Sequence, residues 1–319
     1  MKINVGIVGY GNLGKAVEQI ILSRNDLNLV AVFSRRLIKS KFNTLIESYE
    51  NISLYKDKID IMMLCGGSFG DLDKQTTDAL LYFDCINTFD NHKKLLGEYK
   101  RLDNLAKSTK HRLIMACGWD PGVFSIIRAM CYAFSSSKPV VFWGKGISMG
   151  HSEAIRQTKN VLDGIEFTVP NKTALKLARL GKLSCEESLH TRDCYVLANK
   201  RYHKVIENNI KNIPDYFRGQ VVNVNFVSSE ELLKLRSKLS HKGEIISNFK
   251  TIDGSRCEFN FKLKTSSNPS LTATIMTKYI DAISNLKKLR QNGAFTPMDI
   301  PVSFLFKPEN YSKIINELC

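Results

Sequence analysis

The 319-residue sequence lacks any long apolar run, and its longest candidates, such as Ile59–Cys65, have the length of a β-strand. A helix that spans a bilayer needs about 18 to 20 consecutive apolar residues, so we expect no membrane segment. Glycines interrupt the apolar stretch at the N-terminus, and no small-residue cleavage site follows it. A secretory signal is therefore not expected, and the predicted location is the cytoplasm.

Metal-ligand spacing is also missing. The eight cysteines contain no Cys-x-x-Cys motif, and the six histidines contain no pair at helical spacing. Structural zinc sites depend on such pairs, so we expect no metal. In a reducing compartment the cysteines are expected to be small buried hydrophobic residues.

Acidic residues are scarce relative to basic ones, because 31 Asp and Glu stand against 46 Lys and Arg and give a formal net charge of +15. Such an excess is typical of proteins that bind nucleic acid or membrane surfaces. Here, however, the basic residues are 32 Lys and only 14 Arg, they are spread along the whole chain, and no run exceeds two residues. A scattered Lys excess indicates a solvated surface, so we expect no nucleic-acid partner.

The hydrophobic fraction of 43% is ordinary for a globular protein, and the length suggests two domains. The chain begins with an apolar strand at Ile3–Val8, a glycine turn, a helical pattern over Lys15–Arg24 and a second strand at Leu29–Phe33. Further strand-like runs follow at Ile59–Leu64, Cys85–Thr88 and Arg112–Ala116. Strands that alternate with helical patterns predict an α/β domain of Rossmann type with a mostly parallel sheet.

After Pro121 the pattern changes to strands separated by helices of varied length, which predicts an α+β domain. The strand candidates are Val140–Trp143, Ile165–Val169, Cys194–Ala198, Val221–Val227, Glu244–Ile246 and Cys257–Leu263. The last of these alternates with period two, which places four side chains on one face: Cys257, Phe259, Phe261 and Leu263.

A long helix is predicted to start at Asn268-Pro269, because Asn is a favoured cap and Pro suits the first turn. It is expected to reach about Gln291, with Gly293 as its C-terminal stop. The predicted division is a dinucleotide-binding domain over residues 1–118, completed by 268–319, with a second domain inserted over 119–267.

A glycine-rich turn follows the first predicted strand. Gly9-Tyr10-Gly11-Asn12-Leu13-Gly14 matches Gly-x-Gly-x-x-Gly between a strand and a helix, the context in which that pattern binds a dinucleotide. The first glycine allows the tight turn, the second lets a pyrophosphate approach the backbone, and the third allows close packing of helix on strand. A purely structural glycine turn is the alternative.

The residues after the second strand favour NADP over NAD. An NAD site usually carries Asp or Glu there, whereas this chain has Ser34, Arg35 and Arg36, whose hydroxyl and guanidinium groups suit a 2′-phosphate. An exposed basic loop is the alternative. After a further strand, the small residues of Cys65-Gly66-Gly67-Ser68 are predicted to let the ribose or nicotinamide of the cofactor pass, although a simple β–α turn also explains them.

Two carboxylates follow strands of the predicted sheet, at the edge where ligands gather in open α/β folds. Asp90 follows Cys85–Thr88, and Asp120 follows Arg112–Ala116. Both are candidate catalytic groups, but Asp120 also fits a helix cap before Pro121, and Asp90 also fits a turn cap.

Short segments, taken in their order and spacing, point to one known family. They are Gly6–Gly14, Phe33–Arg36, Thr88–His92, Gly118–Gly122, Phe142–Gly144, Gly150–Ser152, Pro214–Phe217, Asn268-Pro269 and Gly293–Thr296. Together they resemble the meso-diaminopimelate dehydrogenase family, whose NADP-dependent enzymes oxidatively deaminate the D-centre of meso-2,6-diaminopimelate. The resemblance implies the products ammonia and L-2-amino-6-oxopimelate, which can cyclise to tetrahydrodipicolinate, in the biosynthesis of lysine and peptidoglycan precursors.

The resemblance also implies roles for particular residues. Those implied to surround the reacting D-centre are Asp90, Asp120, Trp119, Ser148, Met149 and Gly150. Those implied to hold the distal L-centre and its carboxylate are Thr168, Arg192, His241 and Asn268, with Trp143 as a further substrate-binding residue. Met149 stands where relatives commonly have Gln, and Cys117 stands where Thr or Ser is expected. The inserted domain is implied to bind substrate and to form a homodimer.

In the reaction implied by this resemblance, the α-hydrogen of the D-centre leaves as hydride to NADP, and Asp90 or Asp120 handles the proton. Two alternatives stay open from the residues alone. One is another NADP-linked reductase of amino-acid metabolism, of the dihydrodipicolinate-reductase type, which shares only the first domain. The other is a non-catalytic NADP-sensing protein that binds nucleic acid, which calls for a helix-turn-helix or an Arg-rich face.

Overall fold

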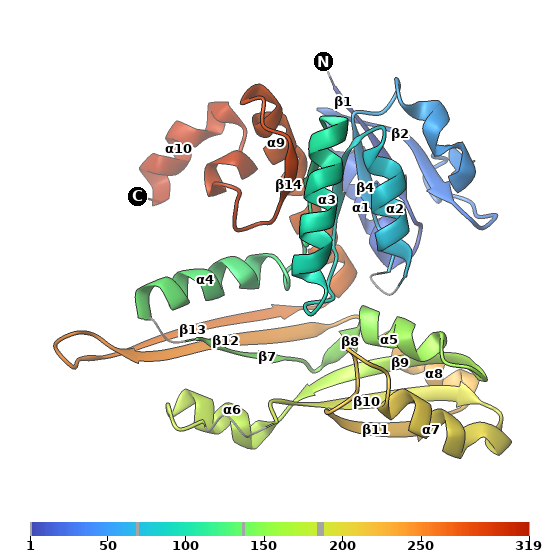
Figure 1. The fold of residues 1–319 in the computed structure, drawn as a ribbon, viewed down its shortest axis with the longest axis vertical. Coiled ribbons are helices and arrows are strands. Elements are labelled where there is room, and N and C mark those ends of the chain that lie inside the picture. Colours follow the sequence, from blue (N-terminus) through green and yellow to red (C-terminus); the bar gives the residue numbers. More distant parts are fainter. Residues whose placement is uncertain (1, 68–69, 136–137, 184–187, 319) are drawn as a thin grey trace. The chain divides into compact units, whose positions relative to one another are not determined.

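A computed structural model describes residues 2–67, 70–135, 138–183 and 188–318, and it divides into two compact units (Figure 1). The first unit comprises the chain up to Ile126 together with the segment from Pro269 onward. The second unit is Ile127–Asn268. The assignment of cofactor binding to the first domain and of substrate binding and dimerisation to the second stays a prediction.

A parallel sheet of seven strands forms the centre of the first unit, with the order β14-β6-β5-β4-β1-β2-β3. Every pair of neighbours in this sheet is parallel. The strands are β1 (Ile3–Val8), β2 (Leu27–Ser34), β3 (Ile46–Ser48), β4 (Ile61–Leu64), β5 (Asp84–Asn87), β6 (Arg112–Ile114) and β14 (Gly293–Phe295). The prediction of an α/β domain with a parallel sheet is confirmed.

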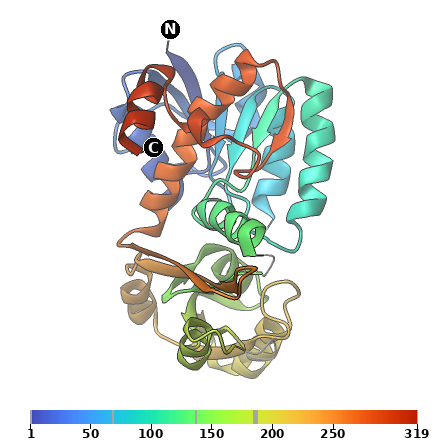
Figure 2. The same cartoon turned by 90° about the vertical axis from the view of Figure 1, so that its left-hand side faces the viewer.

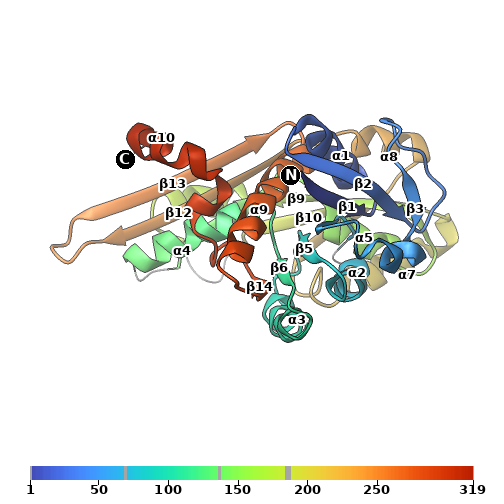
Figure 3. The ribbon, with the colours of Figure 1, turned by 90° about the horizontal axis from the view of Figure 1, so that it is seen from above.

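Helices cover both faces of this sheet. The helices that pack against it are α1 (Asn12–Ser23), α2 (Asp71–Leu80), α3 (Leu95–Thr109) and α9 (Asn268–Lys288). The chain also forms α4 (Val123–Ser135), α10 (Pro308–Leu318) and 3-10 helices at Tyr49–Tyr55 and Val302–Leu305. Val17 and Ile21 of α1 pack in one buried cluster with Ile280 of α9, whereas α2 and α3 contribute to a second cluster. Figure 3 shows α1 on one side of the strands and α2 and α3 on the other. A sheet covered on both faces explains why β4 is buried along its whole length.

The end of α9 differs from the prediction. Gly293 does not stop the helix, because it begins β14, which pairs with β6. The left-handed residue after the helix is Arg290, with φ of 54°, and the backbone N–H of Gln291 donates to the carbonyl of Leu286 at 3.0 Å. The C-terminal segment returns to the N-terminal part of the same unit, where Nζ of Lys307 lies 3.3 Å from Oδ2 of Asp26 (Figure 2).

Two smaller sheets form the second unit. A four-stranded sheet has the order β11-β10-β9-β8, and a three-stranded antiparallel sheet has the order β13-β12-β7. The strands are β7 (Val140–Trp143), β8 (Gly146–Ser148), β9 (Val161–Pro170), β10 (His190–Ala198), β11 (Val221–Phe226), β12 (His241–Lys250) and β13 (Arg256–Thr265). The helices are α5 (Met149–Arg156), α6 (Lys172–Arg179), α7 (His203–Lys211) and α8 (Ser229–Arg236), with a 3-10 turn at Lys200–Tyr202. The mixed α+β character matches the prediction.

The alternating face predicted on β13 is only partly covered by the chain itself. Phe259 is 45% exposed and Phe261 is 39% exposed, while Cys257 and Leu263 are half-buried. Large aromatic side chains on a strand are more often buried, so this face is an unusual apolar surface.

In residues 2–67, 70–135, 138–183 and 188–318, no helix combines the length and the apolar character that a bilayer crossing needs. In the same ranges, no group of three or more His, Cys, Asp or Glu side chains is placed to hold a metal ion.

Candidate active site

The carboxyl ends of the parallel strands bring five predicted loops to one edge of the sheet in the first unit. Backbone hydrogen bonds join neighbouring loops there. The N–H of Gly9 donates to the carbonyl of Phe33 at 3.0 Å, and the N–H of Cys65 donates to the carbonyl of Val8 at 2.8 Å. The loops after β1, β2 and β4 are therefore adjacent, as a dinucleotide site of this fold requires.

The three glycines of the turn after β1 have different surroundings. Gly9 has φ of +90°, a conformation that side chains rarely adopt. A Cβ on Gly14 would lie 2.1 Å from the carbonyl oxygen of Gly9, so only glycine lets the helix approach the turn. A Cβ on Gly11, by contrast, would meet no atom of the described residues within 4 Å. The space in front of Gly11 is open to a ligand.

The N-terminus of α1 fits a pyrophosphate. Gly11 is its N-cap, no side chain caps it, and its first turn has no acidic residue. Its first backbone N–H groups can therefore donate to an anion, with the helix dipole in support. The side chain of Tyr10 is buried and donates to Glu18, so Tyr10 can serve such a site only through its backbone. Asn12 and Leu13 begin the helix.

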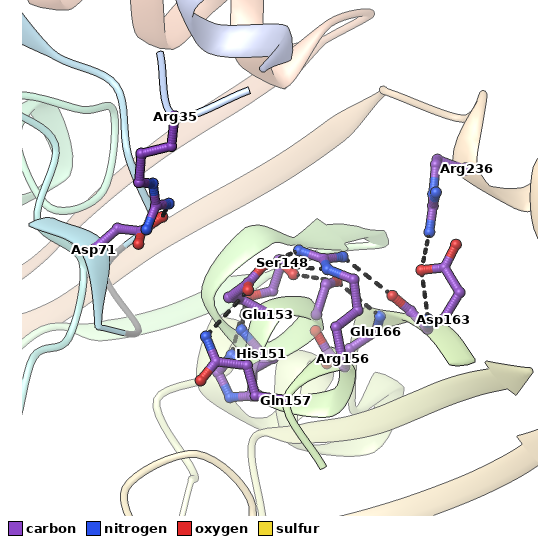
Figure 4. A network of polar contacts seen from close by, with 12 residues as sticks. Arg35, Asp71, Ser148, His151, Glu153, Arg156, Gln157, Asp163, Glu166 and Arg236 are labelled. Atoms are coloured by element: carbon purple, nitrogen blue, oxygen red, sulfur yellow. Dashed lines mark hydrogen bonds and ion pairs between the residues drawn. The ribbon is translucent and has the colours of Figure 1, made fainter. Parts of the chain in front are cut away.

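The basic loop after β2 carries an ion pair. Arg35 is 61% exposed at its side chain, and its Nη2 lies 2.8 Å from Oδ2 of Asp71, the first residue of α2 (Figure 4). The N–H of Arg36 donates to Oγ of Ser34 at 3.0 Å. The loop thus places two guanidinium groups and a hydroxyl at the end of β2. Asp71 restrains the guanidinium of Arg35.

The turn after β4 has a buried amide behind it. A Cβ on Gly66 would come within 2.1 Å of Oε1 of Gln75, a side chain that is only 6% exposed. Among the residues that the structure describes, that oxygen has no hydrogen-bond partner. Cys65 is half-buried, and Gly67 accepts a hydrogen bond from the N–H of Leu72 at 3.1 Å. Ser68 lies outside the described residues. Sequence reasoning missed Gln75, whose position inside a helix gave no signal.

One buried amide joins the two loops that carry the candidate carboxylates. Oδ1 of Asn87, at the end of β5, accepts from the N–H of Phe89 at 3.1 Å and of Ala116 at 3.2 Å. Its backbone carbonyl accepts from the N–H of Cys117 at 2.9 Å. Asp90 and Asp120 follow these segments, and both are partly buried. Asn87 therefore fixes the loop of each carboxylate relative to the other.

The Asp120 loop is tightly folded. The N–H of Gly118 donates to the carbonyl of Pro121 at 2.9 Å, and a Cβ on Gly122, whose φ is +134°, would lie 1.8 Å from the carbonyl oxygen of Gly118. Trp119 is buried and meets Phe124 edge to face, with the ring centroids 5.0 Å apart. Packing of this kind holds the backbone on both sides of Asp120.

In the second unit, strand register brings three predicted residues together. Thr168 of β9 pairs with Gly146 of β8 on one side and with Arg192 of β10 on the other. Residues directly opposite each other share one face of a sheet, so Thr168 and Arg192 meet there. A Cβ on Gly146 would lie 2.2 Å from Cδ2 of His241, so that ring covers the position beside Thr168. Burial lowers the pKa of His241 to about 4.

Arg192 is buried and has several partners. Its Nη1 donates to Oγ1 of Thr168 at 2.5 Å and lies 3.5 Å from Oε1 of Glu166, while its Nε donates to Oε1 of Gln220 at 2.6 Å. Sequence reasoning missed Glu166 and Gln220. A signal for Glu166 existed, because this acid stands between Ile165 and Phe167 in a strand that was otherwise read as apolar.

Trp143 has a partner that sequence reasoning also missed. Its backbone N–H donates to Nε2 of His190 at 2.7 Å, and the two rings stack with centroids 4.9 Å apart. Burial, together with the charge of Arg192, lowers the pKa of His190 to about 3. A neutral ring whose Nε2 accepts is consistent with this shift. His190 thus fixes the orientation of Trp143.

The segment after β8 is built around Ser148. Its hydroxyl caps α5 by accepting from the N–H of His151, and it lies 2.9 Å from Nδ1 of the same residue (Figure 4). The side chain of Met149 is 49% exposed, and Gly150 is buried in the first turn. Asn268 begins α9, where its N–H donates to the carbonyl of Leu239 at 2.8 Å.

Known proteins match this chain over nearly its full length. Residues 118–267 match the diaminopimelic acid dehydrogenase C-terminal domain family. A protein of Ureibacillus thermosphaericus, meso-diaminopimelate D-dehydrogenase, is 36% identical over 98% of this chain and 98% of its own length. The chain belongs to the meso-diaminopimelate dehydrogenase family. The alternative of a dihydrodipicolinate-type reductase predicts likeness in the first domain only, whereas the likeness found here covers 98% of the chain.

Solved structures of the family have the same fold. The diaminopimelate dehydrogenase of Corynebacterium glutamicum, determined in complex with diaminopimelate, superposes with a TM-score of 0.92 at 33% identity, covering 100% of this chain and 99% of the other. An engineered D-amino acid dehydrogenase bound to NADP+ gives a TM-score of 0.94 at 32% identity and covers both chains fully. The predicted Rossmann-type fold with a second α+β domain, the family and the cofactor class are confirmed.

Proposed function

We propose that this chain catalyses the reversible, NADP-dependent oxidative deamination of the D-centre of meso-2,6-diaminopimelate to L-2-amino-6-oxopimelate and ammonia. The observation that carries the proposal is the likeness to meso-diaminopimelate D-dehydrogenases, which extends over 98% of the chain. The charges of the candidate residues support it. A substrate with two carboxylates and two ammonium groups needs cationic and anionic partners, and Arg192, Asp90 and Asp120 supply both.

The proposed cofactor site uses the loops after β1, β2 and β4. The glycine turn and the N-terminus of α1 bind the pyrophosphate, and Ser34, Arg35 and Arg36 bind the 2′-phosphate. The segment Cys65-Gly66-Gly67-Ser68 completes this site in the proposal. Bound NADP supplies the acceptor for the α-hydrogen and its electron pair.

At the D-centre, Asp90 and Asp120 pair with the ammonium group, and one of them accepts the proton that leaves the nitrogen. Loss of the α-hydrogen with its electron pair then converts the neutral amine to a protonated imine. Water adds to that carbon, a carboxylate moves one proton of the water to the nitrogen, and ammonia departs as the remaining hydroxyl proton leaves and the carbonyl forms. In this proposal the same carboxylates orient the water, and Trp119 supplies an apolar wall.

At the L-centre, Arg192 and Thr168 hold the distal carboxylate. A guanidinium suits this role because it donates two parallel hydrogen bonds to a carboxylate. The proposal gives supporting contacts to six further positions. His241 and Asn268 contact the L-centre, Ser148, Met149 and Gly150 contact the D-centre, and Trp143 is a further substrate-binding residue. Since Met149 carries no amide, any hydrogen bond from this segment comes from its backbone or from Gly150.

The proposed reaction is tested with purified protein, NADP and the three stereoisomers of diaminopimelate in separate assays. Absorbance of the reduced cofactor and released ammonia are both measured. We expect reduction with equimolar ammonia for the meso isomer, slower reduction for the DD isomer and none for the LL isomer. No reduction with any isomer would contradict the proposal, as would reduction without ammonia.

A homodimer and a cytoplasmic location complete the proposal. The half-exposed aromatic face of β13 continues onto α4, where the ring centroid of the exposed Phe134 lies 6.3 Å from that of Phe259. An apolar surface of this kind supports a second copy of the chain as its partner. The cytoplasm is proposed because NADPH-dependent biosynthesis takes place there, and fractionation of cells that express the protein tests it.

A further inference from the structure

Glu166 is a fully buried carboxyl group that the proposed reaction does not use. It lies in the middle of β9 with 0% of its surface exposed. Its backbone N–H donates to Oγ of Ser152 of α5 at 2.9 Å (Figure 4). Burial of a carboxyl group is unfavourable unless its polar atoms have partners, so its side-chain contacts are informative.

The side chain of Glu166 contacts the two residues that the proposed function assigns to the distal carboxylate. Its oxygens lie 3.1 and 3.2 Å from Oγ1 of Thr168. Nη1 of Arg192 lies 3.5 Å from Oε1 of Glu166 and 2.5 Å from the same threonine oxygen. The threonine hydroxyl therefore stands between an acid and a guanidinium.

The hydrogen bonds of that hydroxyl can be counted. A threonine oxygen has one hydrogen to donate and two lone pairs to accept with, and an N–H of Arg192 takes one lone pair. An ionised Glu166 can only accept, so it would take the single hydrogen of Thr168. A neutral Glu166 donates its own O–H to the second lone pair, and the hydrogen of Thr168 stays available to a substrate carboxylate.

The surroundings favour the neutral form. Burial raises the pKa of Glu166 to about 8, although Arg192 acts in the opposite direction. Asp193 raises it further. Two strands and one helix bring further polar groups near Glu166. β8 places Ser148 opposite it, and β10 places Cys194 opposite it, with Asp193 and Arg192 next along that strand. α5 contributes the hydroxyl of Ser152, the ring of His151 and the ion pair of Arg156 with Glu153 (Figure 4).

We propose that Glu166 is a positioning residue whose neutral form leaves the Thr168 hydroxyl and the Arg192 guanidinium to the distal carboxylate of the substrate. The inference rests on the proposed function, because it takes Thr168 and Arg192 as the carboxylate-binding pair. Ionisation of Glu166 withdraws the hydroxyl, pairs with the guanidinium and repels the incoming carboxylate, and all three effects weaken substrate binding.

The test compares the KM for meso-diaminopimelate of the wild-type protein and of Glu166→Gln at saturating NADP, from pH 7 to 9.5. The amide donates to Thr168 as the neutral acid does, but it cannot ionise. We expect similar KM values at pH 7 and a ratio of wild-type to variant KM that rises by roughly up to tenfold per pH unit above pH 8. Titration of the substrate's own ammonium groups affects both proteins alike and cancels in this ratio.

Glu207→Gln is the control, because Glu207 is an acid of the same unit that pairs with Lys211 of its own helix at 2.6 Å, away from the groups around Glu166. It is expected to keep the wild-type pH profile. A KM ratio that stays constant from pH 7 to 9.5 for Glu166→Gln overturns the inference. A wild-type protein that never reduces NADP with meso-diaminopimelate overturns the proposed function instead.

Thr168→Val provides a second route in case Glu166→Gln does not fold. It removes the hydroxyl that ionised Glu166 is inferred to withdraw. We expect its KM to exceed that of the wild type at pH 7 and the difference to close above pH 8. A difference that persists undiminished to pH 9.5 overturns the inference.

Discussion

At the scale of single residues, substitutions of Gly11 and Gly14 in the turn after β1 are expected to have different effects on stability and on NADP binding. A Cβ at position 11 meets no atom of the described residues, and the backbone there has an ordinary φ of −79°, so Gly11→Ala is expected to change the free energy of unfolding by less than about 1 kcal/mol. The added methyl group would occupy the space proposed for the pyrophosphate. We expect the KM for NADP to rise at least about tenfold, measured by initial rates alongside urea unfolding.

Gly14→Ala is the matched comparison. Its Cβ would lie 2.1 Å from the carbonyl oxygen of Gly9, so α1 must move away from the turn. The free energy of unfolding should fall by about 2 to 3 kcal/mol. Equal loss of stability in both variants would mean that the space in front of Gly11 is not a ligand site.

The selectivity for NADP is predicted to reside in Arg35 and Arg36. Replacing both with Ala should raise the KM for NADP by at least about tenfold more than that for NAD, because each charge-assisted hydrogen bond to a phosphate contributes about 1.5 to 3 kcal/mol. Arg101→Ala is the control, since Arg101 is also exposed and paired with an acid, Glu98, in the same unit. An unchanged preference in the double variant would remove these residues from the phosphate site.

At the scale of elements, Asn87 at the end of β5 connects the two carboxylate loops. Asn87→Ala would leave the buried N–H groups of Phe89 and Ala116 without their acceptor. We expect kcat to fall by roughly ten- to a hundredfold, because small displacements of catalytic groups have effects of this size. Thr76→Val removes only the contact of Asn87 Nδ2 at 3.1 Å and should lower stability with little change in kcat. Equal kcat values for the two variants would contradict a positioning role for Oδ1.

The sequence predicted the elements that carry a strong local pattern. β1 and β4 are continuous apolar runs, and the glycine turn with α1 has a recognisable motif, so their positions were read correctly within a few residues. β3, β8 and β14 have three residues each, too few for any periodicity to be seen. The prediction that Gly293 ends α9 is wrong for a related reason, since glycine suits both a helix end and a strand start.

The geometry of the candidate site could not be predicted from local patterns. The contact of Thr168 with Arg192 depends on the register between β9 and β10, which no short segment determines. The partnership of Glu166 with both residues follows from that register. The resemblance to a family named Thr168 and Arg192, but a buried partner that need not touch a ligand is found only in the folded chain.

At the scale of the whole molecule, the exposed aromatic face of β13 makes a prediction about assembly. We expect the protein to have twice the mass of one 36.1 kDa chain by light scattering at micromolar concentration. Phe259→Asp and Phe261→Asp together should shift the mass to that of a monomer, because they place charges in an apolar contact. Phe42→Asp, at another exposed aromatic residue, should leave the mass unchanged. A double variant that remains dimeric would exclude this face as the interface.

The buried titratable groups of the second unit together predict how stability depends on pH. His190 and His241 have pKa values lowered by burial to about 3 and about 4, so the unfolded chain binds their protons first as the pH falls below 6.5. Their contribution to stability is present above pH 6.5 and is lost toward pH 4. Glu166 is the reverse case, because burial raises its pKa from 4.5 to about 8. Its contribution is complete below pH 4.5 and is lost as the pH rises to 8.

These opposite dependences place the maximum of stability near pH 6.5. Between pH 4.5 and 6.5 the two histidines outweigh the one acid, so the free energy of unfolding rises with pH. Between pH 6.5 and 8 only the acid contributes, and stability falls by up to about 1.4 kcal/mol per pH unit. The free energy of unfolding of the full chain, measured with urea at pH 5, 6.5 and 8, gives both slopes. Glu166→Gln should abolish the fall in the free energy of unfolding above pH 6.5. Between pH 4.5 and 6.5 the free energy should rise more steeply with pH in this variant, because Glu166 no longer opposes the two histidines. An alkaline slope that survives in this variant would assign it to other groups.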